Sequence, residues 1–263
     1  MTDAIHEQAA RVRVWYNLVA DAFAHRYDDR SGWYFERCEE DLLHAVVPLA
    51  DRRILDLGTG SGRLLPRLAK QARSVTGVDI SESLLRRTPR VAGAAIAQMD
   101  ALDLGFQPES FDTVVSLGLF EYVSDLGPFL HEIRRVLRPG GQLAFTYHQA
   151  MSYRRMKDEA PETKYFGRTV AERTQYWSKA RHRRADVEAA LGRHGFSLAR
   201  RYRVFFRAPQ YLYARSCRLT PGSAGDRLLR AGVVASDRLL GRALRPITQF
   251  WTGNVLTVAQ KRT

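Results

Sequence analysis

Seven consecutive residues constrain this chain more than any others: Asp56-Leu57-Gly58-Thr59-Gly60-Ser61-Gly62. They follow a short apolar run and precede an apolar pattern of helical period, and Asp79 ends the next apolar run. Because glycine has no Cβ, the backbone can turn sharply from strand to helix and a ligand can approach the free amides of the helix N-terminus. An acidic side chain about 20 residues further on is placed to accept hydrogen bonds from ribose hydroxyls. The arrangement predicts a pocket for a nucleoside cofactor.

The spacing of the glycines distinguishes two kinds of nucleoside site. Dinucleotide-binding folds use Gly-x-Gly-x-x-Gly, in which the third glycine permits close helix–strand contact beside a pyrophosphate. Here Arg63 stands where that third glycine would fall, and the observed order is Gly-x-Gly-x-Gly after an acidic residue. The spacing therefore does not favour a dinucleotide.

Three further motifs follow in order: VDIS at 78–81, MDA at 99–101 and LRPGG at 137–141. Together with the glycine string they make the segment from Arg53 to Tyr147 resemble the class I S-adenosylmethionine-dependent methyltransferases. Four motifs in order, at the spacing of successive strand–helix units, are far more specific than one glycine string. The resemblance implies S-adenosylmethionine as the cofactor, and a seven-stranded sheet whose last strand lies antiparallel between the fifth and the sixth.

The alternation of short apolar runs with helical patterns predicts an α/β fold with a Rossmann-like, doubly wound parallel sheet, because the helical crossovers must cover both of its faces. The expected strands are 53–57, 74–78, 94–98, 111–117, 142–147, 197–206 and 254–259, and the expected helices are 63–71, 81–87, 126–137 and 185–194. Pro66 should start the first helix late or bend it, and Gly195 should end the last. We expect this domain over 51–263, with insertions at about 151–182 and 208–252.

Residues 1–50 are expected to form a helical lid. Apolar side chains recur on one helical face at Val12, Trp15, Tyr16, Val19 and Phe23, and on a second stripe at Leu42, Leu43, Val46 and Val47. The segment YNLVADAF at 16–23 is similar to the Tyr-Asp/Asn-x-x-Ala-x-x-Tyr/Phe helix of many small-molecule members of the resembled family. The similarity implies that this helix folds over the cofactor, although an amphipathic helix that only packs on the sheet would show the same pattern.

The resemblance also implies a role for each matching residue. Asp79 would hold the ribose hydroxyls, Asp100 would accept from the adenine amino group, and Asp56 would chiefly fix the glycine loop. The implied cofactor-binding residues are Tyr16, Asp56, Gly58, Thr59, Gly60, Asp79, Ile80, Met99, Asp100, Ala101, Ser116 and Leu117. Among these, Tyr16 would approach the methionine carboxylate, and Ser116 and Leu117 would lie beside the sulfonium.

The acceptor side is less defined. Methyl transfer from a sulfonium needs alignment above all, and it needs a base only when the nucleophile arrives protonated. His148 directly follows the fifth expected strand, and imidazole titrates near neutral pH, so we take it as the candidate catalytic base. His25, Tyr27, Glu121 and Tyr122 are weaker alternatives, and each of these residues could equally be structural.

Charge is distributed unevenly along the chain. Residues 1–150 hold 17 lysines and arginines against 20 aspartates and glutamates, whereas residues 151–263 hold 24 against 8. The basic part predicts contact with something anionic: a phosphorylated or carboxylated acceptor, a membrane surface or RNA. Arginines on ordinary solvated helices remain an alternative. Within 208–252, a helical face carries Leu229, Val233, Ser236, Leu240, Leu244 and Ile247, as either a buried lid or a membrane-docking helix would.

The remaining features favour a cytoplasmic enzyme. Cys38 and Cys217 indicate neither a disulfide framework nor a zinc site, and we expect no metal. The charged N-terminus does not resemble a secretory signal, and no uncharged apolar run approaches the length of a membrane span. Our leading hypothesis is O- or N-methylation of a small molecule. A lipid-linked acceptor is the alternative, and RNA is less favoured because Ser116-Leu117-Gly118 replaces the Asp/Asn-Pro-Pro-aromatic motif of enzymes that methylate base amino groups.

Overall fold

A mixed sheet forms the centre of the molecule. The computed structural model describes residues 2–25, 30–148, 182–203 and 254–263, with isolated positions between 224 and 235. Its strands are β1 (Arg53–Leu57), β2 (Ser74–Asp79), β3 (Ala94–Gln98), β4 (Phe111–Ser116), β5 (Leu137–His148), β6 (Phe196–Arg203) and β7 (Asn254–Lys261). They lie in the order β3-β2-β1-β4-β5-β7-β6, and β7 runs antiparallel to both of its neighbours. The expected seven-stranded topology is confirmed.

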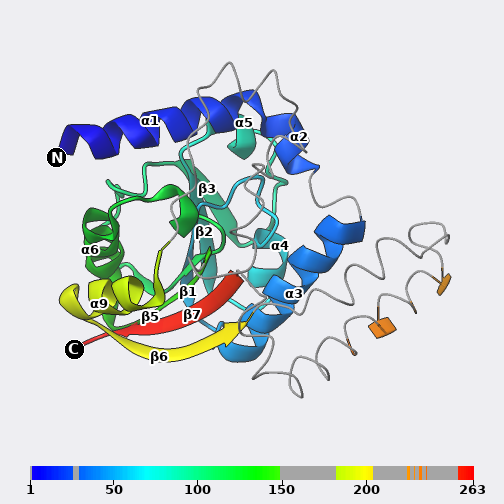
Figure 1. Ribbon diagram of the computed structural model, residues 1–263. Coiled ribbons are helices and arrows are strands. Elements are labelled where there is room, and N and C mark those ends of the chain that lie inside the picture. The colour runs from blue at the N-terminus through cyan, green and yellow to red at the C-terminus, as the bar shows by residue number, and fades with distance from the viewer. Residues whose placement is uncertain are drawn as a thin grey trace.

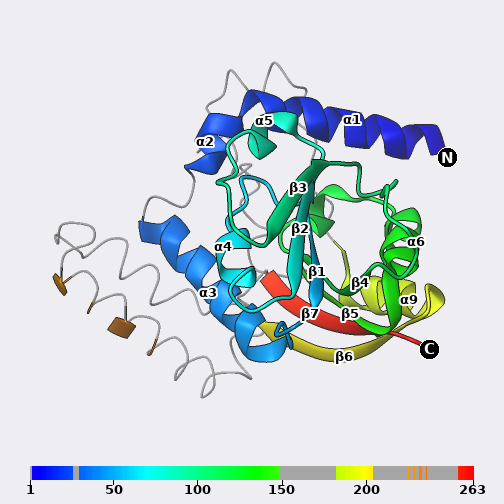
Figure 2. The same cartoon turned by 180° about the vertical axis from the view of Figure 1, so that it is seen from behind.

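Helices cover both faces of this sheet (Figures 1 and 2). They are α1 (Thr2–Leu18), α2 (Ala20–Ala24), α3 (Arg30–Val46), α4 (Leu65–Leu68), α5 (Glu82–Leu85), the 3₁₀ turn η1 (Phe120–Tyr122), α6 (Leu126–Val136) and α9 (Arg184–Arg193). Every residue of β1 after Arg53 is buried, as expected for a strand covered on both faces. Such a strand cannot show the alternation of polar and apolar residues that marks a half-exposed strand.

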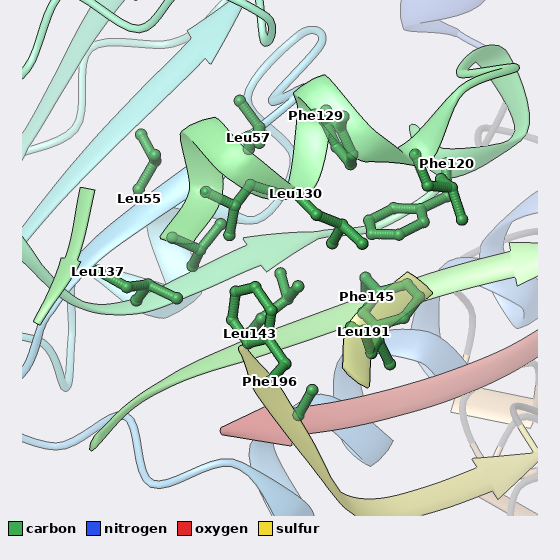
Figure 3. Packing of buried hydrophobic residues seen from close by; sticks show 14 of the residues in the cluster. Leu55, Leu57, Phe120, Phe129, Leu130, Leu137, Leu143, Phe145, Leu191 and Phe196 are labelled. Atoms are coloured by element: carbon green, nitrogen blue, oxygen red, sulfur yellow. The ribbon is translucent and has the colours of Figure 1, made fainter. Parts of the chain in front are cut away.

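The larger apolar cluster fills the face covered by α6 and α9. It joins Leu55 of β1 and Leu143 of β5 to Phe129 of α6 and Leu191 of α9 (Figure 3). In α6, Phe129, Leu130 and Ile133 recur at helical spacing, and all three are fully buried. The opposite face is filled by a second cluster in which Leu43 of α3 and Leu65 of α4 meet Ile54 of β1.

A third cluster belongs to the N-terminal helices. Val12, Trp15, Tyr16, Val19 and Ala20 are buried together with Leu84 of α5. Figure 1 shows α1, α2 and α5 on the same side of the molecule, at the top of the view. The apolar face predicted for this segment is therefore the face that the structure buries, whereas Val14 and Leu18 of α1 remain exposed.

Several element boundaries differ from those expected. The helix predicted at 63–71 is limited to Leu65–Leu68, with Pro66 in its first turn, where a missing N–H costs nothing. The strand predicted from Gln142 begins at Leu137, which pairs with Phe111, and the register of the β4–β5 pair shifts between Phe111 and Thr113. Gly195 has a φ of +75° just after α9, which confirms its predicted place at the helix end.

Parts of the sequence predictions fall outside the described residues. These are most of the two expected insertions, the apolar face from Leu229 to Ile247, and the end of the sixth strand beyond Arg203. The division into a lid at 1–50 and a domain at 51–263 stays a prediction. Among the helices that the structure describes, none combines the length and the apolar character that a membrane span requires.

Candidate cofactor site

The glycine loop lies between β1 and α4, beside the carboxyl end of β2. The amides of Gly58 and Thr59 each donate to the carbonyl oxygen of Val78 at 2.9 Å. Gly60 and Gly62 have φ angles of +58° and +77°, a region that residues with a Cβ seldom adopt. β1 pairs with β2 on one side and β4 on the other, so the loop lies where the strand order changes direction, which is where open α/β sheets bind ligands.

Asp56 supports this loop from inside the protein. Its side chain is buried, and Oδ2 accepts a hydrogen bond of 2.6 Å from the Thr59 hydroxyl. Burial disfavours the charged form and raises the pKa of Asp56 to about 6, and the hydrogen bond from Thr59 and the charge of Arg63 oppose that rise. The geometry agrees with the loop-fixing role expected of Asp56, and direct contact with the cofactor stays a prediction.

The Asp79 carboxylate connects the glycine loop with the end of β2. Oδ2 accepts from the amide of Gly60, and Oδ1 accepts from the amide of Ser81, both at 2.9 Å. A carboxylate oxygen has more than one lone-pair site, so each can accept a hydroxyl in addition to an amide. The carboxylate predicted to hold the ribose is thus fixed in orientation by the two segments on either side of it.

The residues predicted to surround adenine come together at the ends of β2 and β3. The amide of Met99 donates to the Asp79 carbonyl at 3.1 Å, and the side chain of Gln98 donates to the Ile80 carbonyl at 3.1 Å. Asp100 begins a turn in which its Oδ1 accepts from the amide of Leu102 at 2.9 Å. We find no partner for its Oδ2 among the described residues, so that oxygen has the capacity expected for an amino group.

Two residues of α6 hold the loop that follows Asp100. Oε2 of Glu132 accepts from the Leu104 amide at 2.9 Å, and Arg135 donates to the Phe106 and Leu104 carbonyls at 2.6 and 2.5 Å. The same two side chains form an ion pair at 2.8 Å, and the hydrogen bond from Arg135 holds the pKa of Glu132 below its usual range. This pair of contacts was not predicted from the sequence. Its only sequence signal is an acid and a base at i and i+3 on a helix that follows β4.

The carboxyl end of β4 lies beside the glycine loop. The Ser116 hydroxyl is buried without a hydrogen-bond partner in the part of the chain that the structure describes. Gly118 donates its amide to the Thr146 hydroxyl at 2.8 Å, and a Cβ built on Gly118 would meet no atom of the described residues within 4 Å. A Cβ on Gly58 would lie 3.2 Å from Leu119, so this strand end and the loop are neighbours. Leu117 is buried beside them.

The N-terminal helices cover this region with aromatic side chains. The ring of Tyr16 packs edge-on against Phe23 and Tyr122, at centroid distances of 4.8 and 5.5 Å. A Cβ built on Gly60 would lie 3.3 Å from Cε1 of Phe23, so α2 touches the glycine loop itself. Ile80 joins the same cluster. The predicted position of the lid segment over the loop agrees with these contacts.

The candidate catalytic groups are only partly described. The backbone of His148 pairs with Asn254 at the end of β5, but its side chain lies outside the described residues, and so does Tyr27. His25 is exposed just after α2, and Glu121 is buried in η1. The structure therefore leaves the assignment of a catalytic base as a prediction.

A buried histidine that the sequence analysis missed lies beside the same turn. Nε2 of His182 is 3.2 Å from the Phe120 carbonyl and 2.9 Å from the Val123 carbonyl, so this nitrogen carries the proton that both oxygens accept. His182 thus fixes the turn that carries Glu121 and Tyr122. No spacing motif marks it, since it lies about 60 residues beyond the turn in sequence.

Residues 55–145 match the family model described as a methyltransferase domain. This match covers the glycine loop, Asp79, Asp100 and the end of β4, which are the elements that the structure assembles at one edge of the sheet. This segment of the chain is a methyltransferase domain, and it is similar to the domain of the class I S-adenosylmethionine-dependent methyltransferases. The family model ends at Phe145, before the segments that follow β5.

Curated relatives match about half of the chain. A ubiquinone biosynthesis O-methyltransferase from Pseudomonas putida is 31% identical over 146 residues, and the match covers 48% of this chain and 59% of that protein. The chain thus aligns with less than two thirds of the relative's length. This likeness supports the family of the shared domain and leaves the acceptor open.

Solved structures support the fold over nearly the whole chain. An S-adenosylmethionine-dependent methyltransferase from Thermotoga maritima has a TM-score of 0.64 at 16% identity, covering 95% of this chain and 99% of that one. Magnesium protoporphyrin IX methyltransferase from Synechocystis, solved with bound S-adenosylhomocysteine, has a TM-score of 0.60 at 16% identity and covers 97% and 99%. At these identities the likeness shows the architecture alone.

The residues at this edge of the sheet fit S-adenosylmethionine. Four features lie along the same edge of the sheet: the Asp79 carboxylate, Oδ2 of Asp100, and, as far as the described residues show, an open position at Gly118 and a Ser116 hydroxyl without a partner. S-Adenosylmethionine presents ribose hydroxyls, which the Asp79 carboxylate can accept, and an adenine amino group, which Oδ2 of Asp100 can accept. Its cationic sulfonium is predicted to lie beside Ser116. Among the described residues, no group of three or more histidine, cysteine, aspartate or glutamate side chains is arranged to hold a metal ion.

Proposed function

We propose that this protein transfers a methyl group from S-adenosylmethionine to an oxygen or nitrogen atom of a small molecule. The observation that carries the proposal is the Asp79 carboxylate, which the amides of Gly60 and Ser81 fix between the glycine loop and the end of β2. The O-methyltransferase names of the curated relatives support a small acceptor.

The chemistry requires alignment more than a reactive side chain. When bound, S-adenosylmethionine supplies an electrophilic methyl group that an acceptor lone pair displaces in line, with a neutral thioether as the leaving group. The chain's part is to hold and enclose the reactants: Asp79 and Asp100 position the nucleoside, and Tyr16 and Phe23 close over the loop. Holding two reactants in line can contribute roughly 7–11 kcal/mol to lowering the barrier.

A proton must leave when the acceptor is a hydroxyl. His148 at the end of β5 is our candidate to take it, because a neutral imidazole is a base near neutral pH. An amine with a free lone pair would need no such help. The dependence of the rate on His148 therefore bears on the chemical class of the acceptor.

A lipid-linked acceptor at a membrane surface is the second candidate. Leu228 is 75% exposed, within a segment in which arginine is the most frequent charged residue. An exposed apolar side chain beside cationic residues suits docking to anionic lipid. The cytoplasmic location and any contact of the basic region with membrane, acceptor or RNA stay predictions.

Methyl transfer from labelled S-adenosylmethionine tests the proposal directly. The purified protein is incubated with three acceptor pools from a bacterial lysate: water-soluble small molecules, extracted lipids and total RNA. We expect the label in the small-molecule pool. Label confined to the lipid pool would favour the second candidate, and label confined to RNA would contradict both candidates.

A further inference from the structure

A hydrogen-bonded connection runs from the N-terminal helices to the carboxylate of the cofactor site. Oδ1 of Asn17, near the end of α1, accepts from the Ser81 hydroxyl at 2.7 Å and from the Ser83 amide at 3.1 Å. The amide of Ser81 donates to Oδ1 of Asp79, and Oδ2 of Asp79 accepts from the Gly60 amide. Four residues from three separate parts of the chain are thus joined in series.

Ser81 is the point where the lid meets the site. Its side chain is fully buried, and its hydroxyl donates to Asn17 while accepting from the Leu84 amide at 3.2 Å as the N-cap of α5. A hydroxyl has one proton, so the Asn17 oxygen decides where that proton points. With both its amide and its hydroxyl engaged, Ser81 has a fixed position, and the Asp79 carboxylate that it binds is fixed as well.

The same two parts of the chain also meet on the far side of the loop. Phe23 of α2 lies against Gly60, whose amide is the second donor to Asp79. Movement of the N-terminal helices away from α5 would therefore disturb Asp79 through both of its donors. Conversely, a cofactor bound at Asp79 would favour the arrangement in which the N-terminal helices pack on α5. The reason is that linkage between two equilibria acts in both directions.

We propose that Asn17 is a positioning residue that couples closure of the N-terminal helices to cofactor binding at Asp79. The inference rests on the proposed function in one respect, the assignment of the cofactor to Asp79. Asn17 acts through its acceptor oxygen, since no hydrogen bond from its amide group is found among the described residues. An aspartate at this position keeps an acceptor oxygen in place, whereas an alanine removes it.

The structure offers a matched control in the same pair of helices. Oδ1 of Asp21 in α2 accepts from Nε of Arg87, just beyond α5, at 2.8 Å. The side chain of Asp21 is 86% exposed, so this ion pair is screened by solvent. Asp21→Ala therefore removes one link between the lid and the α5 region without touching Ser81 or Asp79.

The first arm of the test needs no ligand. Amide hydrogen exchange is measured by NMR for wild type, Asn17→Ala, Asn17→Asp and Asp21→Ala. We expect faster exchange at Ser81 and Gly60 in Asn17→Ala alone, because their common acceptor is no longer held in place. Wild-type exchange at both amides in Asn17→Ala, or the same acceleration in Asp21→Ala, would overturn the coupling.

The second arm measures binding of S-adenosylhomocysteine by calorimetry and the exchange protection that it induces in residues 15–20. We expect Asn17→Ala to bind about tenfold more weakly, the effect of losing one to two hydrogen bonds, and to lose the induced protection, while Asn17→Asp restores both. Wild-type affinity in Asn17→Ala, or no rescue by Asn17→Asp, would contradict the inference. If wild type itself fails to bind, the proposed cofactor function fails, and the first arm still decides whether Asn17 holds Asp79.

Discussion

The amide of Gly60 donates to the Asp79 carboxylate across 2.9 Å, although the two residues belong to different strand–helix units. This bond joins the loop after β1 to the end of β2, and the Ser81 amide holds the other oxygen of the same carboxylate. The site therefore depends on the backbone conformation of the glycine loop, whose positive φ angles only certain residues allow.

Gly62→Ala should destabilise the protein markedly. The residue has a φ of +77°, and a Cβ there would lie 2.3 Å from Cγ2 of Thr88, so strain and a clash add together. We expect a loss of about 2–4 kcal/mol in the free energy of unfolding, measured by urea denaturation.

Gly118→Ala is the matched control for that substitution. Its φ of +83° imposes similar backbone strain, but its Cβ would meet no atom within 4 Å in the part of the chain that the structure describes, so we expect a loss of only about 1–2 kcal/mol. The Thr88→Ala background should recover part of the loss in Gly62→Ala and none of the loss in Gly118→Ala. If Gly62→Ala and Gly118→Ala lowered the free energy of unfolding equally, both in wild type and in the Thr88→Ala background, the clash with Thr88 would not contribute.

Asp56→Asn should change how stability depends on pH. Burial raises the folded-state pKa from 3.8 to about 6, so the folded wild type binds more protons than the unfolded chain between these values. Wild-type stability should therefore fall as the pH rises through this window, by about 3 kcal/mol in total, and the asparagine variant should lack this component. Urea unfolding from pH 4 to pH 8 measures the difference. If the free energies of unfolding of the two proteins differed by the same amount at every pH, Asp56 would not titrate in this window.

Glu132→Ala should weaken recognition of adenine in particular. The substitution removes the acceptor of the Leu104 amide and the partner of Arg135, so the loop after Asp100 loses its hold on α6. We expect a loss of about 1–3 kcal/mol in stability and weaker binding of S-adenosylhomocysteine. The deaminated analogue, S-inosylhomocysteine, has no amino group for Asp100 and should bind both proteins with equal, low affinity.

Glu82→Ala serves as the control for Glu132→Ala, because its ion pair with Arg86 is exposed and worth little. This variant should bind S-adenosylhomocysteine and S-inosylhomocysteine with wild-type affinity. A Glu132→Ala protein that loses affinity for the two ligands in the same proportion would show a general loss of structure and not a loss of adenine recognition.

The prediction for His148 concerns the pH profile of the reaction. If His148 takes a proton from a hydroxyl acceptor, the wild-type rate under saturating substrates should rise with pH, because only the neutral imidazole can act as the base. His148→Ala should lower kcat roughly 100-fold and abolish that rise while binding S-adenosylhomocysteine normally. A variant with the wild-type profile would remove His148 from the mechanism and favour an acceptor that arrives deprotonated.

The fold could be predicted from the sequence because local patterns encode it, and the residues proposed for the cofactor were found from equally local motifs. The runs predicted as strands at 53–57 and 111–117 have strand length and are bounded by turn residues, and the glycine string has a conformation that few other sequences can adopt. Pro66 and Gly195 likewise have local consequences, and both lie where they were expected.

Contacts between residues that are distant in sequence and belong to no motif could not be predicted. The local sequence pattern does not indicate that Asn17 binds Ser81 or that Glu132 binds Leu104. It does not indicate that His182 binds the turn at Phe120 either. Their partners are set by how the helices pack on the sheet, so they follow from the tertiary structure. The predicted start of β5 at Gln142 was wrong for a similar reason. Pairing of Leu137 with Phe111 extends the strand beyond the shift in register between β4 and β5.

Calorimetric titration of S-adenosylhomocysteine into wild type and Asp79→Ala tests the central claim most directly. Since the carboxylate is both the predicted ribose acceptor and the partner of the Gly60 amide, we expect micromolar binding to wild type and a loss of at least 100-fold in the variant, a size suited to a charged hydrogen-bonding group. Thermal unfolding should show both proteins folded at the temperature of the titration. Undiminished affinity in a folded Asp79→Ala protein, or binding of a nicotinamide dinucleotide in its place, would contradict the account.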